Sequence, residues 1–367
     1  MNQREKIQKE ALEHISDKHR AGLGISMGVG KTYIGLQHMN SEYLKGKRKF
    51  LVVAPKTSIY QSWKDDAVKF ELPYLLECIK FTTYLSLKKQ KSDFDVIYLD
   101  ECHSLLDSHD FYLSMYGGKI IGLTGTPPRY KTSEKGKMVD KYCPIVYKYI
   151  ADDAIDDEIL NDYKIIIHRI PLSRERNFKV TNKDKKGFFM TSEYESYRYW
   201  TDRINQTFIT PKQKQIFRVM RMKTMMEFPS KETYAKALLD MQHEKTILFC
   251  NTTEQADKLC KHSYHSKNKT SDVNLQMFKD GKTSHLSCVL QLNEGINIPN
   301  LRAGIIMHAY SNERKSSQRI GRLLRLNPKD RSTIHILMHA DTIDEQWVSE
   351  ALKDWDQSKI VVMDSII

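Results

Sequence analysis

Short, almost wholly apolar segments recur along this sequence, and amphipathic stretches long enough for helices separate them. Strands that are apolar throughout are typical of parallel sheets, because helices cover both faces of such sheets. Strand and helix in alternation therefore predict an α/β fold built on doubly wound parallel sheets. In the first part of the chain, the expected strands are residues 23–26, 50–54, 78–81, 96–99 and 120–124.

An interruption in this alternation divides the chain. Residues 151–162 are acidic and polar, and apolar segments return only after them. With 367 residues the chain is also too long for one ordinary domain. We therefore expect a first lobe over residues 1–150, a linker over 151–162 and a second lobe over 163–367. The strands expected in the second lobe are residues 163–172, 245–251, 285–292, 303–310 and 332–339.

The second lobe contains an insertion of different character, about residues 173–236, in which we expect mainly helices. Between Ser173 and Lys223 the sequence has 13 Lys and Arg against five Asp and Glu, and aromatic residues are interleaved with them. Basic residues with stacking rings suit single-stranded nucleic acid or a junction. The alternative is that the rings pack against the second lobe while the lysines stay solvated.

The overall charge and the cysteine pattern narrow the class of protein. The formal net charge is +12, which favours a polyanionic partner such as nucleic acid. The six cysteines form no CxxC pair, as is usual for reduced thiols inside a cell. No apolar run reaches the roughly 18 residues that span a bilayer, and the N-terminus has no signal-peptide pattern. We expect a cytoplasmic protein without a membrane contact, in a host cell if the chain is phage-encoded.

A glycine-rich segment, MGVGKT, lies between an expected strand and an expected helix, which is the context of a phosphate-binding loop. Gly28 and Gly30 can adopt backbone conformations that turn several N–H groups toward phosphate oxygens. The following helix adds its positive N-terminal end. Ile25 stands where the usual pattern has a glycine. The residues of this segment expected to bind the nucleotide are Met27, Gly28, Val29, Gly30, Lys31 and Thr32.

Two adjacent carboxylates complete this candidate site. In DVIYLDECH, Asp100 and Glu101 follow a buried strand, at the end where doubly wound sheets bind ligands. We expect Lys31 to neutralise the β and γ phosphates, and Thr32 and Asp100 to hold magnesium, Asp100 through water. Glu101 would orient and deprotonate the attacking water. A carboxylate pair that follows a phosphate-binding loop predicts a catalytic site for ATP and Mg²⁺.

At these residues the sequence resembles the superfamily 2 helicases of the DExH type. ISMGVGKT and DECH are similar to motifs I and II of that family, and segments similar to its remaining motifs follow in the expected order. LVVAPKTSIYQSW, FTTY and GLTGTPP resemble motifs Ia, Ib and III, and ILFCN, NEGINIP and QRIGRLLR resemble motifs IV, V and VI. The variants are most similar to those of DNA-directed motors: phage branch-migration helicases, the XPB-like group, type III restriction subunits and Swi/Snf remodellers.

The resemblance implies two RecA-like lobes with ATP bound between them and hydrolysis that nucleic acid stimulates. Gln8 stands where the family keeps a glutamine that reads adenine. Gln318 of motif VI is expected to orient the attacking water, and Arg322 and Arg325 to bring positive charge to the γ-phosphate. The residues expected to couple the ATP site to nucleic acid are His103, Thr124 and Thr126.

Nucleic-acid contacts are implied by the same resemblance and are expected to engage the sugar-phosphate backbone. The residues concerned are Pro55, Lys56, Thr57, Thr83, Tyr84, Asn251, Gly295 and Asn297. The implied activity is that of a monomeric, ATP-dependent helicase or translocase that favours DNA, with or without protein partners. Two alternatives stay open: an RNA-directed motor, and an ATP-gated nucleic-acid-binding subunit of a larger nuclease or replication complex.

Overall fold

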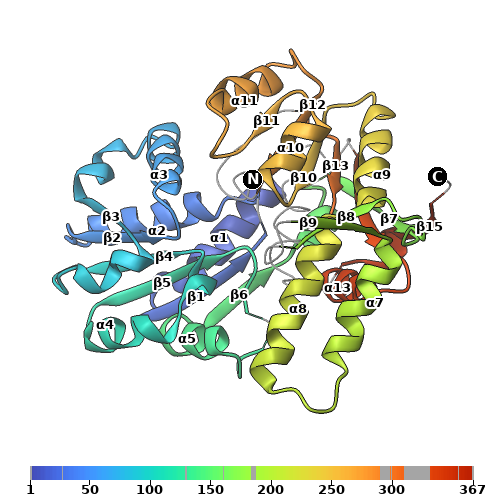
Figure 1. The fold of residues 1–367 in the computed structure, drawn as a ribbon. Helices are drawn as coiled ribbons and strands as arrows, with labels where there is room; N and C mark the ends of the chain where they lie inside the picture. Colours follow the sequence, from blue (N-terminus) through green and yellow to red (C-terminus); the bar gives the residue numbers. More distant parts are fainter. Residues whose placement is uncertain are drawn as a thin grey trace. The chain divides into compact units, whose positions relative to one another are not determined.

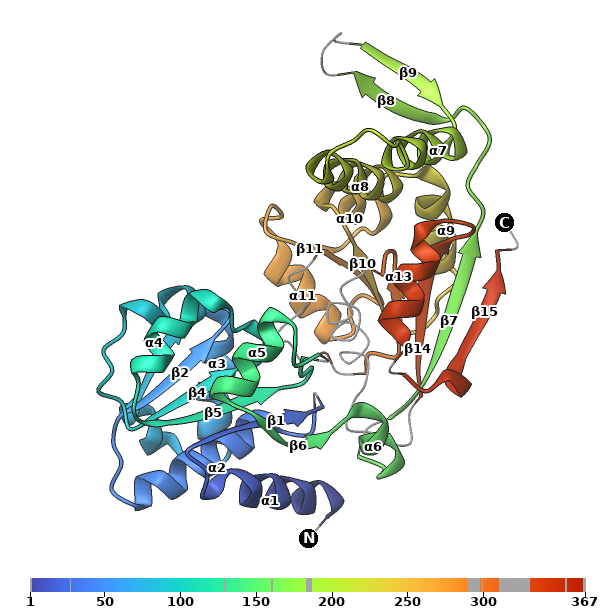
Figure 2. The same cartoon turned by 90° about the horizontal axis from the view of Figure 1, so that it is seen from below.

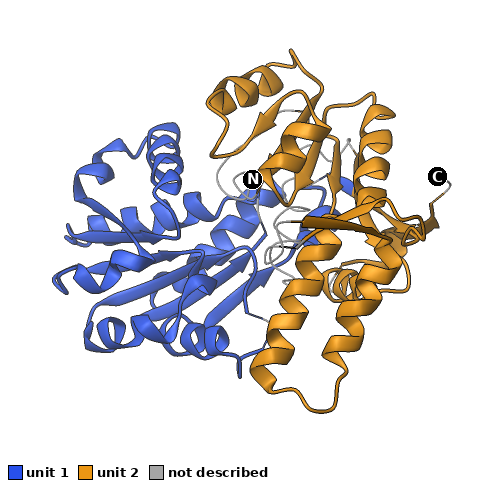
Figure 3. Ribbon diagram, in the orientation of Figure 1, with its two compact units in different colours: residues 1–162, 294–297, 324–330 blue, residues 163–293, 298–323, 331–367 orange. Residues whose placement is uncertain are grey.

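Two compact units divide the polypeptide in the computed structural model (Figure 1, Figure 3). The first unit contains the described residues up to Asp162, and the second contains those from Tyr163 onward. The structure describes residues 2–26, 28–128, 130–159, 161–182, 187–289, 298, 300–309, 331–353 and 355–365. No helix within these ranges is long and apolar enough to cross a membrane.

A six-stranded sheet forms the centre of the first unit. Its strands are β1 (Arg20–Ile25), β2 (Phe50–Ala54), β3 (Ile79–Thr83), β4 (Val96–Asp100), β5 (Lys119–Thr124) and β6 (Ile145–Tyr149). The strand order is β3-β2-β4-β5-β1-β6, and every neighbouring pair runs parallel. Because all six strands run in one direction, their carboxyl ends lie along one edge of the sheet, where doubly wound folds bind ligands.

Helices cover both faces of this sheet (Figure 1, Figure 2). They are α1 (Gln3–Ser16), α2 (Lys31–Leu44), α3 (Ser58–Lys69), α4 (Asp110–Met115) and α5 (Glu134–Tyr142), while α6 (Ala151–Asp156) follows the end of β6. On one face, strand residues such as Leu51 and Ile97 pack in a buried cluster with Leu113 of α4 and Val139 of α5. On the other face, Trp63 of α3 packs against Tyr98 of β4, with the ring centres 6.2 Å apart. Successive strand residues thus point to opposite cores, as their uninterrupted apolar character predicts.

Helix α1 is fixed by its own sequence at both its start and its buried face. Asn2 and Glu5 form a capping box, in which each side chain accepts a hydrogen bond from the backbone N–H of the other residue. Ile7, Ala11 and Ile15 recur every four residues and are buried, so they define the side of the helix that packs on the unit. This packing orients the neighbouring residues of α1 toward the loop that follows β1.

A seven-stranded sheet forms the centre of the second unit. Its strands are β7 (Asp162–Ile170), β10 (Thr246–Cys250), β11 (Ser263–Tyr264), β12 (His285–Val289), β13 (Ala303–Ile306), β14 (Arg331–His339) and β15 (Ile360–Asp364). The order is β11-β12-β10-β13-β14-β7-β15. The helices packed around it are α9 (Pro229–Asp240), α10 (Thr253–Leu259), α11 (Ser271–Lys279) and α13 (Ile343–Leu352). Leu248, Ile305 and Leu337 of the strands form a buried cluster with Leu238 of α9 and Leu259 of α10.

The insertion of the second unit is mainly helical, as expected from the sequence, but it opens with a hairpin that was not expected. Helices α7 (Glu193–Ile204) and α8 (Pro211–Met226) are present, but an antiparallel hairpin of β8 (Phe178–Asn182) and β9 (Gly187–Thr191) precedes them (Figure 2). The physical reason is a period of two in the burial: Phe178 and Val180 pack with Met225 and Phe228, while Lys179 between them faces solvent.

The predicted α/β class with two parallel sheets is confirmed. Every strand expected from the sequence overlaps an observed one, while β6, β8, β9, β11 and β15 were not expected. The unit boundary falls at Asp162, and the first half of the acidic segment expected to be a linker forms α6.

Candidate nucleotide-binding site

The phosphate-binding loop joins β1 to α2 at the carboxyl edge of the first sheet. Gly28 has a φ of 91° and Gly30 a φ of 113°, conformations that residues with a side chain rarely adopt. Gly30 is also the N-cap residue of α2, so the free N–H groups of the first helical turn lie at the loop. Such a loop can cradle phosphate groups with its backbone. Met27, which was also expected to contribute, lies outside the described residues.

Two side chains from α1 hold the backbone of this loop. Gln8 Nε2 donates a hydrogen bond to the Val29 carbonyl oxygen at 2.7 Å, and Arg4 Nε donates to the same oxygen at 3.0 Å. Burial lowers the pKa of Arg4, which keeps its charge beside the loop all the same, because an arginine pKa starts far above neutrality. A Cβ at Gly30 would come within 2.6 Å of Gln8 Nε2, so the close approach of α1 requires this glycine. The sequence had singled out Gln8 but not Arg4.

The two carboxylates lie at the same edge of the sheet. Asp100 ends β4 and Glu101 follows it. Glu101 Oε1 lies 3.7 Å from Lys31 Nζ, and both side chains are largely buried. Asp100 Oδ1 accepts a hydrogen bond from the Glu101 N–H at 2.9 Å, and Asp100 Oδ2 accepts one from Trp63 Nε1 at 2.8 Å. Glu101 has a φ of 51°, in the left-handed region that is strained for a residue other than glycine or asparagine.

Electrostatic surroundings separate these adjacent carboxylates. Burial and the neighbouring Glu101 carboxylate raise the pKa of Asp100 to about 6. Burial also acts to raise the pKa of Glu101, but the Lys31 ammonium and His103 outweigh it and hold this pKa below its usual value. Glu101 is therefore ionised at neutral pH, as a group that takes a proton from water must be.

His103, Thr124 and Thr126 form a connected group around Glu101. His103 Nδ1 lies 2.8 Å from Thr124 Oγ1 and 3.3 Å from Glu101 Oε2. Thr124 Oγ1 lies 3.4 Å from Glu101 Oε2 and accepts a hydrogen bond from the Thr126 N–H at 3.1 Å. The reason is the sheet itself: Leu123 of β5 pairs with Asp100 of β4, so the two strand ends are neighbours. The structure thus brings together the three residues expected to couple the site to nucleic acid.

The side chains at this edge fit a magnesium nucleotide. Thr32 supplies a hydroxyl, which hydrogen-bonds to the Asp66 carboxylate of α3, and Asp100 supplies a carboxylate. Oxygen groups of this kind are the ligands that Mg²⁺ prefers, usually with phosphate and water completing the shell. Among the described residues, no cluster of three or more His, Cys, Asp and Glu could hold a metal by itself. The loop glycines and Lys31 offer N–H groups and a positive charge, which match the phosphates of a nucleotide.

Trp63 belongs to the site although the sequence analysis did not single it out. Its side chain is wholly buried, and a Cβ at Gly35 of α2 would come within 2.8 Å of its ring. The ring is therefore held against α2 while its Nε1 donates to Asp100. Trp63 lies on α3, which begins directly after Thr57, one of the residues expected to contact nucleic acid.

Four residues expected to contact nucleic acid gather at the ends of β2 and β3. Ala54 pairs with Thr83 in the parallel ladder, so the chain leaves β2 through Pro55, Lys56 and Thr57 beside Thr83. Lys56 and Thr57 are exposed. This group lies on the same edge of the sheet as the acidic pair, because all the strands are parallel.

Tyr84 does not lie on the surface, so its predicted contact with nucleic acid is wrong. Its side chain is 5% exposed, and its hydroxyl donates a hydrogen bond to the Asp100 carbonyl oxygen at 2.9 Å. Tyr84 instead supports the strand end that carries the carboxylates. Asn251 follows β10 in the second unit and is partly exposed. The remaining predicted site residues lie outside the described residues: Gly295, Asn297, Gln318, Arg322 and Arg325.

Comparisons with known proteins find a family match in each unit. Residues 2–79 match the family described as "Type III restriction enzyme, res subunit", and residues 230–327 match "Helicase conserved C-terminal domain". The DNA 3'-5' translocase XPB2 of Sulfurisphaera tokodaii is 28% identical over 112 residues, which are 29% of this chain and 26% of that protein. The chain thus spans about a quarter of the length of this relative.

Solved structures share the fold. The ATP-dependent Type ISP restriction-modification enzyme LlaBIII bound to DNA has a TM-score of 0.63 at 15% identity, over 100% of this chain and 31% of that one. Dbp5 of S. cerevisiae, bound to RNA and ADP BeF3, has a TM-score of 0.59 at 13% identity, over 98% of this chain and 89% of that one. At such low identity these likenesses show the architecture alone.

Proposed function

We propose that this chain, which resembles the superfamily 2 helicases in both halves of its sequence and in both of its sheets, is an ATP hydrolase that moves along nucleic acid. The observation that carries the proposal is the contact of Lys31 with Glu101, at the carboxyl edge of the first sheet. It joins a phosphate-binding loop to a carboxylate that can accept a proton, and hydrolysis of a phosphoanhydride needs both.

Each side chain has a distinct task in this chemistry. Lys31 offsets negative charge on the β and γ phosphates, and Glu101 orients a water molecule and takes its proton. Asp100 and Thr32 hold magnesium, which when bound supplies positive charge at the phosphate oxygens. His103 and Thr124 hold Glu101 on the side away from Lys31, so a shift of the β5 end would change the orientation of the base. Through these contacts with Glu101, His103 and Thr124 are proposed to couple nucleic-acid binding to hydrolysis.

DNA is the proposed track for the motor. The similarity to XPB2, a DNA translocase, supports DNA, as do the motif variants in the sequence. Thr83 and the segment 55–57 are proposed to contact the sugar-phosphate backbone from the first unit, and Asn251 from the second. Arg322 and Arg325 of motif VI are proposed to supply charge to the γ-phosphate, as in other phosphoryl-transfer motors.

The test is phosphate release by the purified chain with single-stranded DNA, duplex DNA, forked DNA or RNA. We expect ATP hydrolysis that DNA stimulates more than RNA does. Lys31→Ala should weaken ATP binding and abolish turnover, because no other cation of the loop replaces the ammonium. Glu101→Gln should keep ATP binding and lower kcat by about 100-fold or more, since the amide cannot take the proton. Full activity in Glu101→Gln would refute the assignment of the base.

A second candidate is an ATP-gated subunit of a larger nuclease assembly. It is favoured by one observation: the fold covers all of this chain but only 31% of the LlaBIII restriction enzyme. A triplex-displacement assay separates the two candidates, because a motor dislodges a third strand as it moves along duplex DNA. Tight DNA binding with slow hydrolysis and no displacement by the isolated chain would favour the subunit. Stronger stimulation by RNA would instead favour an RNA-directed motor.

A further inference from the structure

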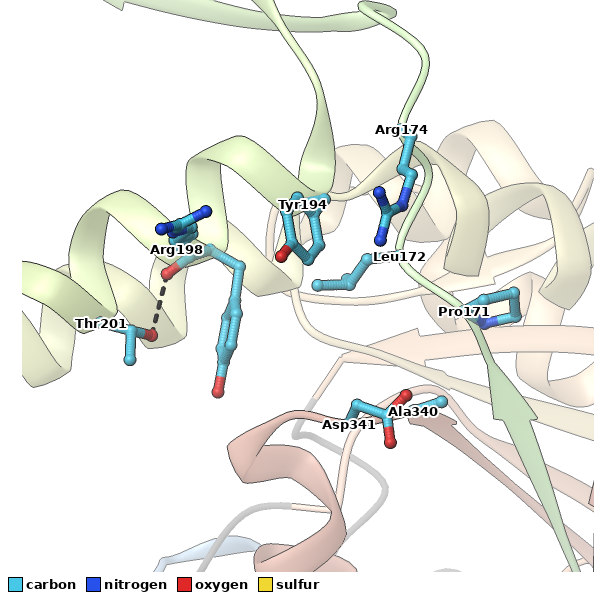
Figure 4. Close-up of a pocket in the computed structure, with 9 residues that line it drawn as sticks. Pro171, Leu172, Arg174, Tyr194, Arg198, Thr201, Ala340 and Asp341 are labelled. Carbon is cyan, nitrogen blue, oxygen red and sulfur yellow. Dashed lines mark hydrogen bonds between the residues drawn. The ribbon is translucent and has the colours of Figure 1, made fainter.

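A pocket in the second unit is lined in part by the basic, aromatic insertion and shares no residue with the candidate nucleotide-binding site. Its walls are the segment after β7, one face of α7 and the turn after β14 (Figure 4). Its volume of about 410 Å³ falls within the roughly 300–1,000 Å³ of pockets that take small organic groups. Ala340 N donates a hydrogen bond to the Ile170 carbonyl oxygen at 2.9 Å, so the ends of β14 and β7 meet here. The pocket thus lies at the carboxyl edge of the second sheet, where α/β folds bind ligands.

Hydrogen bonds fix the aromatic wall of this pocket. The hydroxyl of Tyr197 accepts a hydrogen bond from Ile343 N of α13 at 2.9 Å. Tyr194 N donates to the Ser173 carbonyl oxygen at 3.1 Å, and Glu193, which is fully buried, accepts a hydrogen bond from Ser173 N at 3.0 Å. These contacts join α7 to the segment after β7 and to α13, so the Tyr197 ring and the backbone of Tyr194 are held in place before any ligand arrives.

Two arginines lie against these rings. The guanidinium carbon of Arg174 is 4.6 Å from the centre of the Tyr194 ring, and that of Arg221 is 5.4 Å from the centre of the Tyr197 ring. Figure 4 shows the Arg174 and Tyr194 side chains next to each other at the pocket. Arg221 comes from α8 and donates to the hydroxyl of Thr201, which lines the pocket, at 3.1 Å. Stacked guanidinium and phenol groups present both a flat surface and positive charge.

The positive charge of this pocket is not neutralised by its own carboxylates. Within the part of the chain that the structure describes, neither Arg174 nor Arg221 lies at ion-pair distance from an Asp or Glu. Asp341, the carboxylate in the lining, is 3.6 Å from Arg169 instead. Arg221 is also partly buried, which lowers its pKa, and its Nε makes no hydrogen bond. Arg221 does not itself line the pocket, so Arg174, which has no ion pair among the described residues, is the arginine that an anion in the pocket would meet.

We propose that this pocket binds one nucleotide of a single nucleic-acid strand, with the base against Tyr194 and the phosphate beside Arg174. The inference rests on the proposed function, because the strand is the one on which the motor acts. An aromatic ring beside an arginine suits binding without sequence preference. Every base has a flat face that can stack on the ring, and every nucleotide has a phosphate that can contact the arginine. An acidic peptide would engage the arginines but would leave the tyrosine ring without a stacking partner.

The experiment measures binding of a fluorescein-labelled oligodeoxythymidine to the whole chain by fluorescence anisotropy at fixed salt. Tyr194→Ala should weaken binding by about 5- to 100-fold, the range seen when one stacking ring is removed. Arg174→Ala should weaken it and reduce its dependence on salt, because one phosphate contact is lost. Tyr194→Phe keeps the ring and should bind like the parent chain. Circular dichroism checks that each variant is folded, which is expected because the Tyr194 side chain is 37% exposed.

A matched control lies on the same helix. Arg203 Cζ is 5.3 Å from the ring centre of Tyr199, so this pair has the same chemistry as Arg174 and Tyr194 but does not line the pocket. Tyr199→Ala should leave oligonucleotide binding unchanged. Photocross-linking of an oligonucleotide that carries 5-iodouracil should label Tyr194 or Tyr197, as mapped by mass spectrometry.

The outcomes separate this inference from the proposed function. If the parent chain hydrolyses ATP and binds the oligonucleotide, but Tyr194→Ala binds equally well, the pocket assignment fails and the motor stands. If DNA neither binds nor stimulates hydrolysis, the proposed function fails as well. Binding of polyglutamate that depends on Arg174, with oligonucleotide binding that does not, would assign the pocket to an acidic protein and overturn the inference.

Discussion

Asp100 and Glu101 are adjacent in the sequence, but the surroundings of the two carboxylates differ. Asp100 is buried against Trp63, with both oxygens engaged by N–H donors. Glu101 faces Lys31 and His103, which favour its ionised form. Opposite pKa shifts in neighbouring acids are a common sign of separate roles, here a magnesium ligand and a base.

A single hydrogen bond to Asp100 gives a prediction for Trp63. Trp63→Phe removes the Nε1–H donor, so the Asp100 carboxylate loses its fixed orientation. Because a hydrogen bond to a charged group contributes about 1.5–3 kcal/mol, we expect the Mg²⁺ concentration for half-maximal hydrolysis to rise about tenfold or more. ATP binding without magnesium should change little, since Lys31 and the loop are intact.

The matched control for this prediction is Tyr98→Phe. Tyr98 is buried beside Trp63 and also loses one polar atom, but its hydroxyl contacts His38, not Asp100. We expect its magnesium dependence to match that of the parent chain. An unchanged Mg²⁺ requirement in Trp63→Phe would contradict the positioning role.

The sequence predicted the site residues that belong to contiguous motifs, and it missed those that reach the site across the fold. The loop glycines and the carboxylate pair are recognisable because each group consists of residues close together in the sequence. Their order along the chain is therefore enough to predict that they lie close together in the fold. Arg4 and Trp63 reach the site from helices 25 and 37 positions away from the residues they contact. Tyr84 was misassigned because an aromatic residue at a strand end looks the same in sequence whether its ring faces solvent or the core.

At the scale of elements, a buried ion pair joins two helices of the second unit. Lys231 of α9 and Asp344 of α13 lie 2.5 Å apart, and both side chains are 1% exposed. Asp344 also accepts a hydrogen bond from His339 N at the end of β14. Since each charge is out of water, the pair holds both helices to the sheet only while both partners are present.

Removing one partner of this pair tests its contribution. Lys231→Met should destabilise the second unit by about 3–5 kcal/mol, because it leaves the Asp344 carboxylate buried without a counter-charge. The double variant Lys231→Met, Asp344→Asn should recover most of that loss. Lys236→Met on the same helix removes a lysine whose pair with Asp240 is exposed, and it should cost at most about 1 kcal/mol. Urea unfolding measures all three, and equal effects of the two lysines would contradict the prediction.

Most strands of the two sheets were predictable because apolar residues predominate in them and polar turns bound them. The hairpin of β8 and β9 was not predicted from the sequence. Its exposed face carries Lys179, and an alternation of buried and exposed residues over only five positions is difficult to distinguish from irregular sequence. β11 has two residues, too few to show any pattern. Short or amphipathic strands depend on partners distant in sequence, which composition does not reveal.

At the scale of the whole molecule, buried histidines make the two units respond differently to acid. Burial lowers the pKa of His168 and of His335 in the second unit to about 4, and the two rings contact each other at 2.9 Å. Burial also lowers the pKa of His38 in the first unit to about 4. Such groups stay neutral in the folded chain below pH 6.5, where the unfolded chain takes up protons.

The sign of the effect follows from proton binding. Between about pH 6.5 and 5 the unfolded state binds more protons at these histidines, so stability falls as the pH falls, by up to about 1.4 kcal/mol per pH unit for each histidine. In the first unit the raised pKa of Asp100 has the opposite sign, because the folded state then binds the extra proton. Burial also lowers the pKa of His109 in the first unit, so Asp100 offsets only part of the loss there. We therefore expect the second unit to lose more stability than the first in this range.

Hydrogen exchange followed by mass spectrometry at pH 6.5 and pH 5, corrected for intrinsic rates, would measure this difference unit by unit. Replacing His168 and His335 together by glutamine should reduce the pH dependence of the second unit, and the rest should remain because burial also lowers the pKa of His339. Equal losses in both units, or a second unit that is insensitive to acid, would contradict the assignment. The two-unit layout was predictable from the chain length and the interrupted alternation, whereas the acid response depends on burial that no sequence pattern displays.

The left-handed backbone at Glu101 has a consequence for any attempt to improve the protein. At a φ of 51°, glycine or asparagine would relieve about 1 kcal/mol or more of conformational strain. A screen that selects for thermal stability alone would therefore favour variants without the Glu101 carboxylate, and these variants would be inactive. At this one position, stability and catalytic activity are opposed, and a glutamate is retained there only under selection for activity.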